Sequence, residues 1–246
     1  MSKFITKLPK KFKVPNDSVG RRILQEYGAL FVARGGAIPP RAVIFKNESE
    51  VSSFQSGLAK ASENLGGFNI ELQAVAMKRL RDAIAEAEQK DLTITPRGAD
   101  SGRRDYSGTV ELWASRVNPG LAHWIGEGRL SPAEAERIKI LSPFEQVPEI
   151  FKLECEGIFF SKDLSKSIVY SVAPPGTSQH LSMLALDVNE HNDSDVRDVL
   201  ARHFWFQTVV SDLPHFTFLG VPENKLVGLG LKQVADGERI FWLPDL

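Results

Sequence analysis

Apolar side chains recur with the period of an α-helix in residues 71–90, ELQAVAMKRLRDAIAEAEQK. Leu72, Ala76, Leu80 and Ala83 fall near one face of such a helix, whereas charged side chains fill the other face. The segment therefore predicts an amphipathic helix that packs one side against a core.

Several further segments favour helices or strands. Ser131, Pro132 and Glu134 form a capping-box pattern, in which an N-cap serine is followed three residues later by glutamate. Other helices are expected at 18–28, at 48–63, from about Val110, and at 193–204. Strands are expected at 42–45, 92–95, 167–173, 183–188 and 215–220, and in the closing ERIFWLP.

The order of these elements predicts the fold class. One long helix leads into a strand and a polar loop, and several short strands follow in the last third. That order favours an α+β fold with a small, mostly antiparallel sheet and flanking helices. Residues 1–67, which end at Gly66-Gly67, are expected to form an N-terminal extension packed on a main domain at 68–246.

Composition narrows the functional classes. With 42% hydrophobic and 25% charged residues, the 246-residue chain fits a globular protein with a core, and its net charge of -1 argues against nucleic-acid binding. The first residues carry positive charge, but no apolar stretch long enough for a signal peptide or a membrane span follows them. Cys155 is the only cysteine, so a metal would need His, Asp or Glu ligands.

The segment APPGTSQHLSMLALDV, residues 173–188, holds two such candidates. A straight strand would separate His180 and Asp187 by roughly 23 Å. Both can therefore bind one metal only if the chain folds back near Ser182-Met183. A loop at Pro174, Pro175 and Gly176 fits that requirement.

A third candidate lies in the segment SDLPHFTFLG. Pro214 excludes a helix interior and favours an extended chain around His215. Asp212 precedes His215 by three residues, where a base would be useful, although it could also be an ordinary turn residue. A hydrolytic zinc site needs three protein ligands and one open position, and His180, Asp187 and His215 would meet the first requirement.

Three motifs resemble those of the zinc D-alanyl-D-alanine carboxypeptidases and dipeptidases, in the lysostaphin, D-Ala-D-Ala peptidase and hedgehog-like superfamily. S-Q-H-L-S-M-L-A-L-D resembles the family's S-x-H-x-x-G-x-A-x-D, D-L-P-H-F its E-x-W-H, and S-G-R-R-D-Y its S-G-Y-R-S-Y. The resemblance spans roughly residues 68–220 and keeps the family's motif order. It implies a hedgehog/D-Ala-D-Ala-peptidase-like fold with a single zinc site.

The resemblance also implies residue roles. One Zn²⁺ per chain would be held by His180, Asp187 and His215. Arg104 would bind the substrate carbonyl and stabilise the oxyanion, although it could instead pair with Asp100 or Asp105. Asp212 would stand where the family has its catalytic glutamate. Two further residues would contact the substrate or support the site: Ser178 and Tyr106.

Two positions depart from the family pattern. Met183 replaces a glycine, and a left-handed backbone there would strain methionine by roughly 1 kcal/mol or more. Asp212 is one methylene shorter than glutamate, so it could place the reacting water well or poorly. These departures leave two alternatives open, an active enzyme and a catalytically impaired protein.

The expected function is hydrolysis by a D-Ala-D-Ala carboxypeptidase-type zinc metallopeptidase. Its partner would be a peptidoglycan stem peptide or another D-Ala-containing peptide, and the resemblance points to the bacterial cell envelope. One alternative is a catalytically impaired, metal-containing module that binds cell-wall peptides. Another is an endolysin-type peptidoglycan endopeptidase.

Overall fold

The computed structural model describes residues 2–246 of the chain. Its α-helices are α1 (Ser18–Tyr27), α2 (Glu48–Ser56), α3 (Ala74–Glu88), α4 (Tyr106–Gly126), α5 (Pro132–Lys139), α6 (Pro143–Cys155) and α7 (Ser194–Arg202). Its strands are β1 (Lys60–Leu65), β2 (Phe68–Gln73), β3 (Ala185–Asp187), β4 (Trp205–Gln207), β5 (His215–Phe218), β6 (Leu231–Asp236) and β7 (Arg239–Pro244). Two short 3-10 helices, η3 (Ile168–Tyr170) and η4 (Gln179–Ser182), matter for the site.

The strands form small antiparallel sheets. β1 pairs with β2, β6 pairs with β7, and β5 lies between β3 and β4. The predicted α+β class with mostly antiparallel pairing is therefore confirmed.

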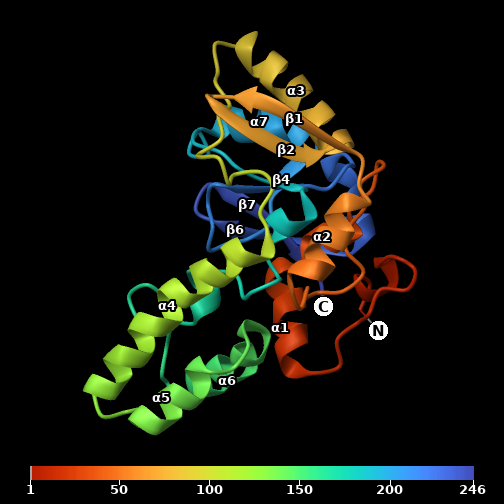
Figure 1. Ribbon diagram of the computed structural model, residues 1–246. Coiled ribbons are helices and arrows are strands. Elements are labelled where there is room, and N and C mark those ends of the chain that lie inside the picture. Colours follow the sequence, from red (N-terminus) through yellow and green to blue (C-terminus); the bar gives the residue numbers. More distant parts are fainter. Residues whose placement is uncertain (1) are drawn as a thin grey trace.

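The helices lie mainly at the two ends of the molecule. α3 packs against the β1–β2 hairpin and against α7 at one end, whereas α4, α5 and α6 extend to the other (Figure 1). The β3–β5–β4 sheet and the β6–β7 hairpin lie between them. None of the helices in residues 2–246 is long and apolar enough to cross a membrane.

The hydrophobic core joins the N-terminal segment to the rest of the chain. Leu24 and Leu30 are buried in the same cluster as Met77 of α3, Trp205 of β4 and Phe216 of β5. Burial of each such side chain stabilises the folded state by about 1.5–3 kcal/mol. The N-terminal residues therefore contribute to the core that supports the β3–β5–β4 sheet.

Hydrogen bonds also attach the N-terminal segment to the loop that precedes η4. The Tyr27 hydroxyl donates to the Val169 carbonyl at 2.9 Å, and the Phe45 amide donates to the Gly176 carbonyl at 2.9 Å. The β1–β2 hairpin spans the predicted boundary at residue 67, because Leu65 of β1 lies opposite Phe68 of β2. The division into 1–67 and 68–246 stays a prediction.

The hairpin corrects two predicted helices. The helix expected at 48–63 ends at Ser56, and the helix expected at 71–90 begins at Ala74. The residues between them form β1 and β2, because Gly66 and Gly67 both adopt positive φ angles and close a tight turn. Cross-strand pairing thus overrides the helical spacing at the two inner ends.

The apolar run at 167–173 is not the predicted strand. It contains η3, and the buried carboxylate of Glu154 accepts hydrogen bonds from the Ser167 hydroxyl at 2.5 Å and the Ile168 amide at 2.6 Å. The Ile168 amide is therefore bound by a side chain instead of by a neighbouring strand.

The strands expected at 42–45 and 92–95 are also wrong. These regions hold only isolated bridges, Lys13 with Ala42 and Pro96 with Val188, among the residues that the structure describes. In the second region, the Thr95 amide donates to the Glu190 carboxylate at 2.8 Å. A side chain again satisfies a donor that a sheet would use.

Candidate metal centre

Two neighbouring strands and one tight turn bring the three predicted ligands together. His180 lies in η4, and Met183 then reverses the chain in a left-handed conformation, with φ 60° and ψ 28°. β3 follows and ends with Asp187, which is directly opposite His215, the first residue of β5. The predicted fold-back near Ser182-Met183 is therefore present, and the methionine occupies the strained conformation expected there.

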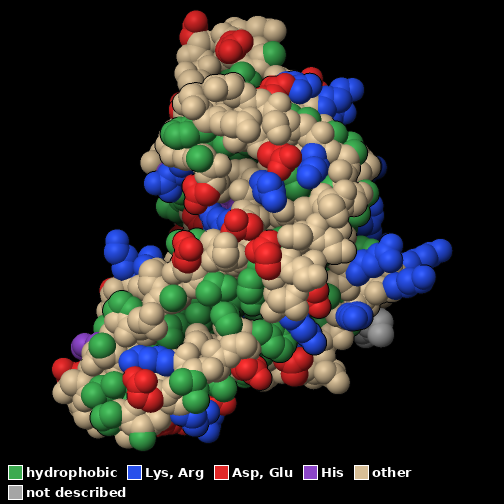
Figure 2. Space-filling view, in the orientation of Figure 1, with side chains coloured by type: hydrophobic (Ala, Val, Ile, Leu, Met, Phe, Trp, Pro, Cys, Tyr) green, Lys and Arg blue, Asp and Glu red, His purple; other side chains and the backbone are tan. Residues whose placement is uncertain are grey.

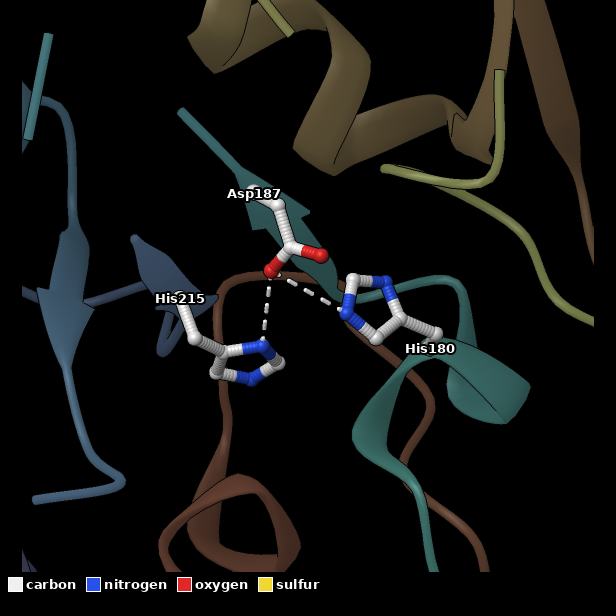
Figure 3. A group of neighbouring side chains, drawn as sticks. All are labelled: His180, Asp187 and His215. Carbon is white, nitrogen blue, oxygen red and sulfur yellow. Dashed lines mark hydrogen bonds and ion pairs between the residues drawn. The ribbon is translucent and has the colours of Figure 1, made fainter. Parts of the chain in front are cut away.

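The side chains of the cluster face one another (Figure 3). Oδ1 of Asp187 is 3.3 Å from Nε2 of His180 and 3.1 Å from Nδ1 of His215. One ligand atom from each of the three residues lies within 4.8 Å of the others. Both histidines are almost fully buried, so the cluster forms a polar centre inside the protein.

This donor set suits a zinc ion. Zinc bonds of about 2.0–2.2 Å in a tetrahedron place neighbouring ligand atoms about 3.3–3.6 Å apart. The two N–O separations in the cluster are close to that range. Two imidazoles and one carboxylate, with no cysteine, leave a fourth position for water.

A backbone carbonyl orients the first histidine. Nδ1 of His180 lies 2.8 Å from the carbonyl oxygen of Gly102, which can only accept a hydrogen bond. The hydrogen of a neutral His180 ring is therefore on Nδ1, and the lone pair of Nε2 faces Asp187. Metal-binding histidines are commonly oriented in this way.

The carboxylate of Asp187 is held in its charged form. Burial raises the pKa of Asp187, but the charge and the hydrogen bond that each imidazole of His180 and His215 supplies in its doubly protonated form outweigh burial and hold that pKa well below its usual range. An ionised carboxylate is the form that binds a metal.

Arg104 lies beside the cluster. Its Nη2 atom is 3.9 Å from Oδ2 of Asp187 and 3.2 Å from Oδ2 of Asp100. The pairing with Asp100 was one of the two alternatives for this arginine, whereas Asp105 caps α4 by accepting from the Gly108 amide. The buried Nε atom of Arg104 has no hydrogen-bond partner among residues 2–246.

The cluster opens into a cleft of about 280 Å³. The predicted site residues that line it include Arg104, Ser178 and Asp212. Its lining also includes apolar side chains, those of Leu112, Val172, Ala173 and Val209. Hydrophobic side chains gather where α4 leaves the sheets, with charged side chains at their border (Figure 2).

Two residues of the S-G-R-R-D-Y segment lie outside this cleft. Tyr106 is buried in a small cluster with Val51 and Leu181, so the structure does not bring it to the cleft. Arg103 points elsewhere, and its Nε donates to Oε1 of Gln55 at 2.7 Å.

The structure adds residues that the motifs did not indicate. Gln179 and Tyr27 line the cleft, and Oε1 of Gln179 is 3.0 Å from Nε2 of His215. The position of Gln179 between Ser178 and His180 was a usable signal, because a buried polar residue next to a metal ligand often orients a ligand. No sequence signal pointed to Tyr27, which is far from the motifs.

Comparisons with known proteins give distant likenesses. No family model and no curated protein matches this chain. Among solved structures it is similar to a glutamate-to-alanine variant of the vancomycin-resistance D,D-pentapeptidase VanY from a VanB-type resistance cassette, in complex with Zn(II). That match has a TM-score of 0.35 and 17% identity over 67% of this chain and 82% of the other. VanYB in complex with D-alanine-D-alanine matches with a TM-score of 0.35 and 18% identity over 65% and 77% of the two chains.

Proposed function

We propose that this protein is a zinc-dependent peptidase of the D-Ala-D-Ala carboxypeptidase type that acts on peptidoglycan stem peptides. The observation that carries the proposal is the cluster of His180, Asp187 and His215, which faces a cleft together with the Arg104 guanidinium. One zinc ion would be held by those three side chains. When bound, zinc supplies a Lewis acid that acidifies water and polarises a carbonyl group.

Arg104 would stabilise the charge that develops on the scissile carbonyl oxygen. Its side chain is only 15% exposed, and its contact with Asp187 places the guanidinium next to the metal ligands. A buried cation acts more strongly on a developing oxyanion than an exposed one, because the surrounding dielectric is low.

Asp212 would move the proton of the reaction. It would accept a proton from the attacking water and deliver it to the leaving amine. The His215 amide donates to the Asp212 carbonyl at 3.1 Å, so a short turn ties this residue to a ligand. The exposed carboxylate has no hydrogen-bond partner within the described part of the chain, 2–246, and is free to contact water in the cleft.

The substrate class is inferred from the three sequence motifs and from the apolar residues that line the cleft. Val172, Ala173 and Val209 are among these residues, and apolar lining suits the methyl side chain of alanine. Ser178, which is buried at the start of η4, would contact the peptide or support the loop that carries His180.

Metal analysis combined with mass spectrometry of digested muropeptides tests the proposal. We expect one zinc per chain and release of free D-alanine, with loss of both in His180→Ala. Protein that is supplied with zinc and still holds no stoichiometric metal would refute the proposal. A longer fragment in place of D-alanine would indicate the endolysin-type endopeptidase.

A second candidate is a metal-containing module that binds cell-wall peptides without cleaving them. The exposed and shorter carboxylate of Asp212 favours it, because few contacts hold that group near the reacting atoms. Two variants separate the candidates. In an enzyme built around aspartate, Asp212→Asn keeps zinc and abolishes turnover, and Asp212→Glu lowers the rate. An inert wild type with an active Asp212→Glu would instead identify a decayed enzyme.

A further inference from the structure

Gln179 is a buried amide with a fixed orientation. It is only 1% exposed, and its Nε2 donates to the carbonyl oxygen of Tyr27 at 3.0 Å and to the hydroxyl of Thr208 at 3.2 Å. A backbone carbonyl has no hydrogen to donate, so the NH₂ side of the amide must face Tyr27. The oxygen of Gln179 must therefore face the opposite way.

That oxygen accepts from the second histidine of the cluster. Oε1 of Gln179 is 3.0 Å from Nε2 of His215, and the hydroxyl of Thr217 also donates to it. The hydrogen of a neutral His215 ring is therefore on Nε2. The lone pair of Nδ1 is left facing Asp187, in the direction that a shared metal ion requires.

We propose that Gln179 is a positioning residue that sets the affinity of the site for zinc. It holds the His215 ring in one tautomer and one orientation, and the Tyr27 carbonyl holds Gln179 in turn. This inference rests on the proposed function, because it takes His215 to be a zinc ligand. Tyr27, a residue of the N-terminal segment, would thus help to support the metal centre through Gln179.

Gln73 provides a matched control for the alternative that Gln179 only fills space. Gln73 is 2% exposed, and its Nε2 donates to the carbonyls of Ile38 at 2.9 Å and Ser182 at 2.7 Å. It thus anchors the same turn through the same kind of hydrogen bonds, but among residues 2–246 its side chain bonds only to backbone groups and to no histidine ring. A merely structural role predicts similar behaviour of the two glutamines.

The test compares Gln179→Met with Gln73→Met, since methionine keeps the side-chain length and removes the acceptor. Zinc affinity is measured by competition with a chelator, and the free energy of unfolding is measured on metal-free protein. We expect Gln179→Met to lose about 10–100-fold in zinc affinity, whereas Gln73→Met stays within about threefold of wild type. Both variants are expected to lose stability to a similar degree.

Equal zinc affinities of Gln179→Met and wild type would overturn the inference. Equal losses of zinc affinity in Gln179→Met and Gln73→Met would also overturn it. If Gln179→Met does not fold, Gln179→Ala removes the same acceptor and carries the same expectation. NMR of the zinc-loaded wild type adds a readout without substitution, because the buried Nε2–H of His215 should exchange slowly. A fast-exchanging or missing signal would contradict the proposal.

The outcomes separate the two proposals. A wild type that binds no zinc would refute the function and this inference together. A wild type that binds zinc and releases D-alanine, beside a Gln179→Met variant of unchanged zinc affinity, would refute this inference alone.

Discussion

Gly176 is the position where the N-terminal segment meets the loop that leads to His180. Its φ angle is +77°, and a Cβ atom added there would lie 1.8 Å from the carbonyl oxygen of Phe45. The Phe45 amide donates to the Gly176 carbonyl at 2.9 Å, so the two backbones cannot separate without losing that hydrogen bond. Gly176→Ala should therefore disturb both folding and the site.

The size of the effect follows from three contributions. A left-handed alanine costs about 1–2 kcal/mol, and overpacking against backbone costs about 1–3 kcal/mol. The lower entropy of the unfolded alanine chain offsets about 0.4–1 kcal/mol. Gly176→Ala should thus destabilise the protein by about 3 kcal/mol, within a range of roughly 1–4.5 kcal/mol.

Gly128→Ala is the matched control. Gly128 also has a positive φ angle, +66°, but a Cβ there would meet nothing within 4 Å. Its cost is strain alone, about 1 kcal/mol after the entropic offset. Urea unfolding of both variants with a chelator present measures the difference, and zinc affinity is measured separately. Equal destabilisation of the two variants would refute the close approach of Phe45. Unchanged zinc affinity in Gly176→Ala would refute the link between this contact and the metal centre.

Further measurements check other parts of the structure. Arg104→Ala should lower kcat by ~10²-fold or more with zinc still bound, whereas Arg103→Ala should matter less, and equal effects in a peptidase assay would contradict the assigned roles. Met183→Gly should relieve about 1–2 kcal/mol of strain but lose about 2–5 kcal/mol of packing, so urea unfolding should show net destabilisation; a more stable variant would mean that strain dominates. Hydrogen bonds from the side chains of Lys90, Arg202 and His203 lower the pKa of Glu86 from 4.5 to about 2. This interaction stabilises the fold above about pH 4.5 and is lost as the pH falls through about 2, so the stability difference between wild type and Glu86→Gln should shrink over that window in thermal unfolding. A pH-independent difference would exclude this interaction.

Local patterns in the sequence were enough to predict several elements and the candidate ligands. The helix that starts after Ser131 and the helix at 194–202 are present, because capping and helical spacing act over a few neighbouring residues. His180, Asp187 and His215 were indicated by residue type and motif order, and the need for a reversal near Met183 followed from the length of an extended strand.

Contacts between distant segments were decided only by the tertiary structure. The apolar run at 167–173 is not a strand because Glu154, from α6, binds its backbone. Tyr106 packs in a core cluster instead of the cleft because α2 supplies Val51 beside it. The orientation of the His215 ring depends on Gln179 and on the carbonyl of Tyr27, which is 152 residues from Gln179 along the chain. Such hydrogen bonds leave no periodic trace in a sequence, since they join positions that only the folded chain brings together.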